Sequence, residues 1–136
     1  MEILQSLAAG FAVILTPANL YYCFIGSLVG TLVGVLPGIG PLAALSLLLP
    51  FTFNLPPVAS LVMLSAIFYG AMYGGSTPSI LVNMPGEAAS VVTCLDGHEM
   101  AKQGRAGAAL GMAALASFVA GTLGTVALTV FSPVLG

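Results

Sequence analysis

Small polar side chains are concentrated in one stretch of this otherwise apolar sequence, residues 74–86. Ser76, Thr77, Ser79 and Asn83 lie there among several glycines and prolines. Hydroxyl and amide groups can bind a carboxylate or a sodium ion without placing a net charge in a membrane. The stretch therefore predicts binding chemistry for a small ion, with Ser76, Thr77 and Asn83 as candidate transient ligands of sodium.

A second stretch combines glycine and proline in the sequence Pro37-Gly38-Ile39-Gly40-Pro41. Glycine permits unusual backbone angles and proline removes an N–H donor, so residues 37–41 and 74–86 both predict interruptions of a helix. Non-helical backbone survives at membrane depth only where protein or a water-filled cavity surrounds it, and secondary transporters build their sites from such paired segments. We expect the two breaks to meet near the middle of the membrane. The alternative is that each is an ordinary loop between two crossings.

The composition places these stretches in a membrane protein. Of 136 residues, 59% are hydrophobic and 4% are charged, which leaves too few polar groups to cover a soluble domain. The net charge is −2 and the basic residues are Lys102 and Arg105, so the sequence predicts no nucleic-acid binding. The positive-inside rule assigns these two residues to the cytoplasmic side.

The apolar segments that flank the breaks predict an all-α integral membrane protein. About four or five transmembrane or half-membrane helices are expected, with segments interrupted by glycine and proline. The apolar segments are residues 3–15, 20–36, 42–53, 58–73 and 106–131. The charged residues cluster in residues 87–105, which predict a polar loop. That loop is expected to contain a turn at Asp96-Gly97 and a short surface helix around Glu99 and Lys102.

Two further patterns concern how the helices are placed. Gly26, Gly30 and Gly34 recur every four residues, which predicts a smooth helix face that another helix can approach closely. Tyr69 and Tyr73 stand at the end of an expected span, where aromatic residues anchor helices to the membrane interface. The alternative for the two tyrosines is a contact with substrate.

Enzymatic, metal and redox functions find little support in the sequence. No nucleophile with its base and no pair of acids lies within the apolar segments, so we expect no enzyme. Cys23 and Cys94 lack metal-binding spacing and are expected to be small packing residues, while His98 is expected to be a solvated loop histidine. The sequence predicts no metal site, no disulfide and no cofactor beyond a coupling ion.

Five motifs in order resemble the N-terminal part of the large membrane subunit of the tripartite tricarboxylate transporters. They are Gly34-x-Leu-Pro-Gly-x-Gly-Pro41, Leu48-Leu-Pro-Phe-Thr52, Tyr69-Gly-Ala-Met-Tyr-Gly-Gly-Ser76, Asn83-x-Pro-Gly-Glu-Ala88 and Thr93-x-Leu-Asp-Gly-x-x-Met-Ala-x-x-Gly-Arg-Ala106. The resemblance runs through nearly the whole chain. Members of this family are considerably longer, so residues 1–136 are expected to be an N-terminal fragment of a multi-span transporter domain.

The resemblance implies a multi-pass protein of the bacterial inner membrane that acts as a secondary transporter. Its implied partners are a small membrane subunit and a periplasmic solute-binding protein, which delivers a citrate-like tricarboxylate or a related carboxylate. Uptake in the family is driven by an ion gradient, typically of sodium, with the proton as the other coupling ion. The alternative function is a non-transporting membrane scaffold that uses the face formed by Gly26, Gly30 and Gly34 for assembly.

The resemblance also implies which residues line the path of substrate and ion. The first set comes from the two breaks and comprises Pro37, Gly38, Gly40, Pro41, Gly74, Gly75, Ser76, Thr77 and Asn83. The second set belongs to the matched motifs that follow and comprises Pro85, Gly86, Asp96, Gly97 and Arg105. Backbone N–H groups and hydroxyls are expected to replace water around the carboxylate, while carbonyls and Asn83 hold the cation.

Overall fold

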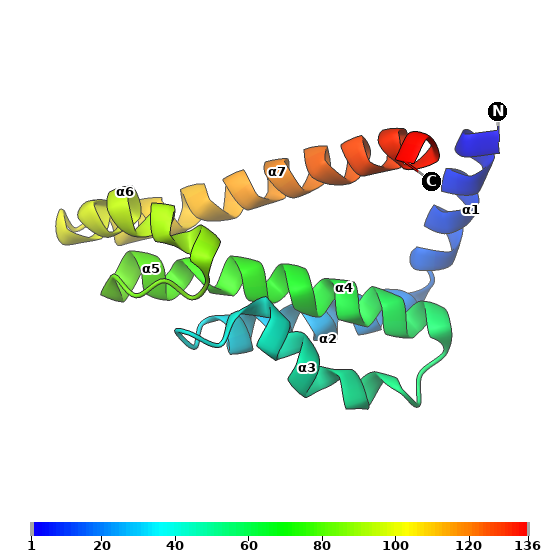
Figure 1. Cartoon of the computed structure of the whole chain (residues 1–136), viewed down its shortest axis with the longest axis horizontal. Helices are drawn as coiled ribbons and strands as arrows, with labels where there is room; N and C mark the ends of the chain where they lie inside the picture. The colour runs from blue at the N-terminus through cyan, green and yellow to red at the C-terminus, as the bar shows by residue number, and fades with distance from the viewer. Residues whose placement is uncertain (1, 136) are drawn as a thin grey trace.

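The computed structural model describes residues 2–135, which form helices joined by short turns (Figure 1). The helices are α1 (Glu2–Ile14), α2 (Pro17–Gly34), α3 (Gly40–Thr52), α4 (Pro57–Gly74), α5 (Ser76–Val82), the 3₁₀ helix η1 (Ala88–Ser90), α6 (Val91–Lys102) and α7 (Ala106–Leu135). The predicted all-α class is confirmed.

Two helical segments of the described part are each long and apolar enough to cross a membrane. The first is Pro57–Val82, which joins α4 and α5 in 26 residues, and the second is Ala106–Val134 of α7, with 29 residues. A hydrocarbon core of about 30 Å needs about 20 helical residues, so both segments suffice. α1 and α2 together would give a third span, but their axes bend by 77°. α3 is a shorter apolar helix.

The chain between α2 and α3 turns over residues 35–39, within the first predicted break. Gly38 has φ 85° and Gly40 has φ 64°, in the left-handed region that glycine reaches without a steric penalty. Pro41 lies in the first turn of α3, where a missing N–H is tolerated. Glycine and proline thus end one helix and begin the next.

The second predicted break contains more helix than its composition suggests. Only Gly75 separates α4 from α5, and the non-helical backbone begins at Asn83. Pro78 lies in the first turn of α5, where its missing N–H is tolerated, and Asn83 ends that helix with φ 58°. The helix is therefore interrupted at a single residue, Gly75, and it ends at Asn83, whose backbone is in the left-handed conformation.

The closest helix packing is between α2 and α4. Gly26, Gly30 and Gly34 are buried there. A Cβ atom on Gly30 would lie 2.8 Å from the Cα of Ile67, and one on Gly34 would lie 2.7 Å from the Cα of Ala71. The predicted packing face is confirmed, and its partner is α4 of the same chain.

The polar segment between α5 and α7 is mostly helical, so the predicted loop and its turn are wrong. Asp96 and Gly97 lie within α6. Gly97 is buried where α6 crosses α5, and a Cβ there would lie 2.8 Å from Cγ1 of Ile80. Close helix packing, and not a turn, explains this glycine. The expected pair of Glu99 and Lys102 is present at 3.3 Å, but both side chains are exposed and the pair adds little stability.

The helices form a packed layer with one arm above it (Figure 1). α2 and α4 lie side by side, and α3 returns along α4. α6 packs on α5 and on the start of α7, which then runs back above α4 toward the end that carries α1. α7 touches α4 at few positions, and Ala109, near its start, is its one buried residue among those whose burial the structure describes. An open space therefore separates α7 from the layer below.

Candidate functional site

A cavity of about 290 Å³ opens where α4, α5, η1, α6 and α7 converge. We call it the Glu87 cavity. Its lining residues are Phe68, Tyr69, Met72, Tyr73, Ser76, Glu87, Ala89, Ser90, Thr93, Ser117 and Gly121. The site therefore combines one carboxylate with serine, threonine and tyrosine hydroxyls on otherwise apolar walls.

Glu87 carries the only charged side chain among the residues that line this cavity. Its backbone is held by Ser90, which is buried. The Glu87 N–H donates to Ser90 Oγ at 3.2 Å, and Ser90 Oγ–H donates to the Glu87 carbonyl at 2.9 Å. Partial burial raises the pKa of the Glu87 carboxyl, because a charged carboxylate loses hydration there. The site thus favours a neutral carboxyl group more than water does.

Three glycines meet beside the Glu87 cavity, and we call this contact the glycine junction: Gly40, Gly75 and Gly86. A Cβ on Gly86 would lie 2.5 Å from the Cα of Gly75, and one on Gly40 would lie 3.8 Å from the carbonyl oxygen of Gly86. The two predicted breaks therefore contact each other through backbone. Gly86 also directly precedes Glu87, so the junction fixes where the carboxylate enters the cavity.

The remaining predicted site residues occupy different environments. Ser76 lines the Glu87 cavity, and Thr77 beside it is half-buried. Gly74 packs on α2, where its Cβ would lie 3.1 Å from the Cα of Gly34. Pro41 is half-buried in α3. Gly97 of α6 is buried against α5. The other residues of the two sets are exposed: Pro37, Gly38, Asn83, Pro85, Asp96 and Arg105.

Asn83 has a backbone role that its sequence position does not reveal. It is in the left-handed conformation at the end of α5, and its N–H donates to the carbonyl of Pro78. Asparagine and glycine are the residues that most often end helices in this way. Its side chain is exposed, so ion binding by the Asn83 amide stays a prediction.

Tyr69 lies in the middle of a span and not at its end. It is the thirteenth of the 26 residues in Pro57–Val82, because α5 extends the helix beyond the expected boundary. Tyr69 and Tyr73 both line the Glu87 cavity. The predicted place at the end of a span is therefore wrong for Tyr69, and both hydroxyl-bearing residues line the cavity.

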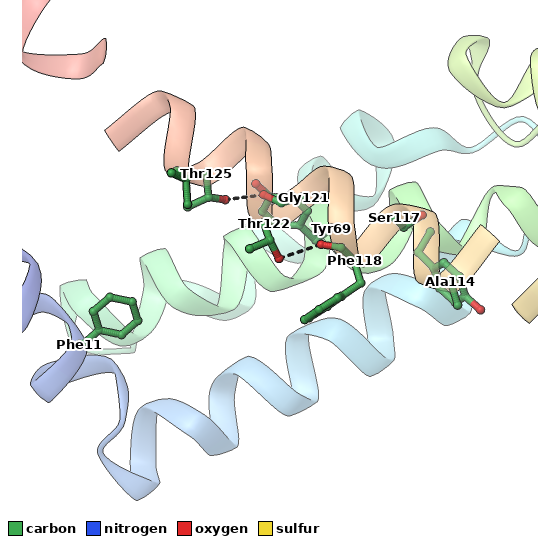
Figure 2. Close-up of a pocket in the computed structure, with 10 residues that line it drawn as sticks. Phe11, Tyr69, Ala114, Ser117, Phe118, Gly121, Thr122 and Thr125 are labelled. Carbon is green, nitrogen blue, oxygen red and sulfur yellow. Dashed lines mark hydrogen bonds between the residues drawn. The ribbon is translucent and has the colours of Figure 1, made fainter. Parts of the chain in front are cut away.

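An apolar cleft of about 600 Å³ continues from the Glu87 cavity between α4 and α7 (Figure 2). The two spaces share Tyr69, Tyr73 and residues of α7. The Thr122 and Thr125 hydroxyls in the cleft each donate to a carbonyl of their own helix at 2.8 Å, as the dashed lines in Figure 2 show. Polar donors are consequently concentrated in the Glu87 cavity.

His98 is tied to α5 and is not the solvated loop histidine that the sequence predicts. Its Nδ1 lies 2.9 Å from the carbonyl oxygen of Ile80. A carbonyl only accepts hydrogen bonds, so Nδ1 carries the proton. The bond satisfies a carbonyl near the end of a helix, where intrahelical partners are missing.

Sequence reasoning placed Glu87 in a motif but did not include it among the site residues. The sequence did contain a pattern that distinguishes Glu87, because it is the first charged residue after Glu2 and follows a long apolar region. Ser90 and Thr93 carried no such signal. Their position in the cavity depends on how α6, which η1 directly precedes, packs against α5 and α7.

The family profile described as "Tripartite tricarboxylate transporter TctA family" matches residues 20–136. The chain belongs to the TctA family. This TctA chain is 56% identical over 133 residues to the "Uncharacterized 52.8 kDa protein in TAR-I ttuC' 3'region" of Agrobacterium vitis. The match covers 98% of the TctA chain and 26% of that relative, so the chain spans about a quarter of the relative's length. No solved structure matches the TctA chain. The predicted family resemblance is confirmed.

Proposed function

We propose that this chain is part of the membrane subunit of a secondary transporter that imports citrate-like tricarboxylates or related carboxylates. The family match over residues 20–136 is the observation that carries the proposal. A gradient of sodium or protons drives uptake, a periplasmic solute-binding protein delivers the substrate, and a small membrane subunit completes the assembly. The assembly resides in the bacterial inner membrane as a multi-pass protein and performs no enzymatic step.

The glycine junction and the Glu87 cavity support a path for solutes at this point. Gly75 and Gly86 bring irregular backbone next to a cavity that Ser76 lines. Irregular backbone inside membrane proteins belongs beside cavities, where water or ligand satisfies it. No basic side chain lines the Glu87 cavity. The charge of a carboxylate substrate is therefore met by backbone N–H groups, by a co-bound cation or by other parts of the longer transporter.

The alternative function, a membrane scaffold, is less consistent with the packing. It requires the face of Gly26, Gly30 and Gly34 to receive a partner. That face is buried against α4 within the chain. A surface that is already occupied by the chain's own helix is not free for assembly, and transport is the function that the site supports better.

The test is uptake of labelled dicarboxylates and tricarboxylates by cells that carry the full-length transporter and its partner subunits. Ser76→Ala removes a hydroxyl from the cavity, and Asn83→Gly removes the amide while keeping the left-handed backbone. Exposed Ser46→Ala is the control. We expect gradient-driven uptake to fall about tenfold or more in both site variants at matched membrane levels.

The outcomes distinguish a wrong assignment of the site residues from a wrong assignment of the function. Full uptake in both site variants would remove Ser76 and Asn83 from the path while leaving carboxylate transport intact. No carboxylate uptake by the wild-type assembly would contradict the proposed function itself.

A further inference from the structure

We propose that Glu87 is the proton-carrying residue of the transporter, taking up one proton from one side of the membrane and releasing it to the other. The inference rests on the proposed transport function and names its coupling ion and the residue that binds it. In the protonated state Glu87 is a neutral carboxyl group, and in the released state it is a carboxylate. One charge is therefore gained or lost in the cavity at each step.

The surroundings of Glu87 suit a carboxyl group that gains and loses a proton. No lysine, arginine or histidine lines the cavity, so no fixed cation holds the carboxylate in its charged form. Partial burial acts in the same direction and raises the pKa of this carboxyl. A group that binds and releases protons is most effective when its pKa lies near the pH at which the protein operates.

The titratable neighbours in the cavity come from α4 alone and are Tyr69 and Tyr73. α5, α6 and α7 contribute Ser76, Thr93 and Ser117, which do not titrate in the physiological range. The charged and imidazole groups of α6 do not line the cavity: Asp96 is exposed, His98 bonds the Ile80 carbonyl, and Lys102 pairs with Glu99. Proton binding in this cavity is therefore assigned to Glu87.

The Glu87 backbone has a defined position, and hydroxyl-bearing residues line the same cavity. Ser90 holds the Glu87 backbone through two hydrogen bonds, and the glycine junction fixes the residue before it. The hydroxyls of Ser76 and Thr93 face the same space from two other elements. A hydroxyl can accept from a protonated carboxyl and donate to a carboxylate, so the hydroxyls that line this cavity suit both states of Glu87.

The first test follows the carboxyl stretch by infrared spectroscopy during pH titration of the purified chain in lipid. We expect a protonated carboxyl signal that persists above the pH at which exposed glutamates ionise, with the same midpoint in sodium chloride and potassium chloride. Glu87→Gln removes the signal. Glu99→Gln, at an exposed residue, retains it. A midpoint equal to that of exposed glutamates, or one that sodium lowers, overturns the proposal.

The second test uses the full-length transporter with its partner subunits in vesicles. Glu87→Gln is expected to reduce accumulation driven by a pH gradient about tenfold or more. Exchange of labelled for unlabelled carboxylate at equal concentrations persists, because exchange needs no net proton movement. Wild-type accumulation in Glu87→Gln would overturn the inference. Loss of exchange in the wild type would instead contradict the proposed function, and the infrared result would stand by itself.

Discussion

Replacing Gly30 by alanine should separate α2 from α4. The added Cβ would lie 2.8 Å from the Cα and 2.9 Å from the carbonyl carbon of Ile67. Ordinary carbon contacts are about 3.5–4.0 Å, so the helices must part by most of an ångström. The obstacle is backbone, which cannot rotate away as a side chain can. Overpacking of this kind costs about 1–3 kcal/mol.

Gly111→Ala is the matched control, because nothing lies within 4 Å of a Cβ at Gly111 in α7. Both variants gain the same helix propensity, about 1 kcal/mol. The difference between them therefore isolates the clash at the α2–α4 contact. It corresponds to a change of about fivefold to about 150-fold in the unfolding equilibrium constant.

The assay is reversible unfolding of the purified chain in mixed micelles, with helix content as the readout. We expect Gly30→Ala to unfold at lower denaturing-detergent fraction than wild type and Gly111→Ala at an equal or higher fraction. Equal stability of the two variants would refute the reasoning. It would mean that α2 and α4 adjust to a methyl group without loss of packing.

Three further predictions concern the region around the site. The free energy of unfolding should fall as pH rises from the ordinary glutamate pKa to the raised pKa of Glu87, because the unfolded chain loses the Glu87 proton at a lower pH than the folded chain. Unfolding of Glu87→Gln measured over the same pH range should not show this decrease. Asn83→Ala should cost about 1–2 kcal/mol because of its φ of 58°, whereas Asn83→Gly should not, as thermal unfolding can check. Ser79→Ala should cost about 1 kcal/mol, since the buried Ser79 hydroxyl donates to the Gly75 carbonyl at 2.8 Å, and exposed Ser46→Ala should cost less in the same unfolding assay.

The sequence predicted the features that depend on local pattern. Gly26, Gly30 and Gly34 repeat at helical spacing, and a row of glycines on one face has few explanations other than close packing. The turn at residues 35–39 followed in the same way from glycine and proline. These signals are carried by neighbouring residues and do not require knowledge of the rest of the fold.

The features that sequence missed depend on helices from distant parts of the chain. Asp96-Gly97 has the composition of a turn, yet contact with Ile80 of α5 explains the glycine within a helix. The Glu87 cavity joins Ser76 to Ser117, and no spacing rule relates residues on helices that cross in this way. Its position could be found only after α6 and α7 were placed.

The backbone contact between α2 and α4 limits how these two helices can move relative to each other. At Gly30 and Gly34 the backbone of α2 lies directly against the backbone of α4, which cannot rotate away as a side chain can. We therefore expect α2 and α4 to move together. α7 differs, because it is joined to α6 through Gly104 at φ 77°, with open space around that residue, and lies largely free of α4. A change in the angle between α6 and α7 would widen or narrow the Glu87 cavity, since α7 supplies one of its walls.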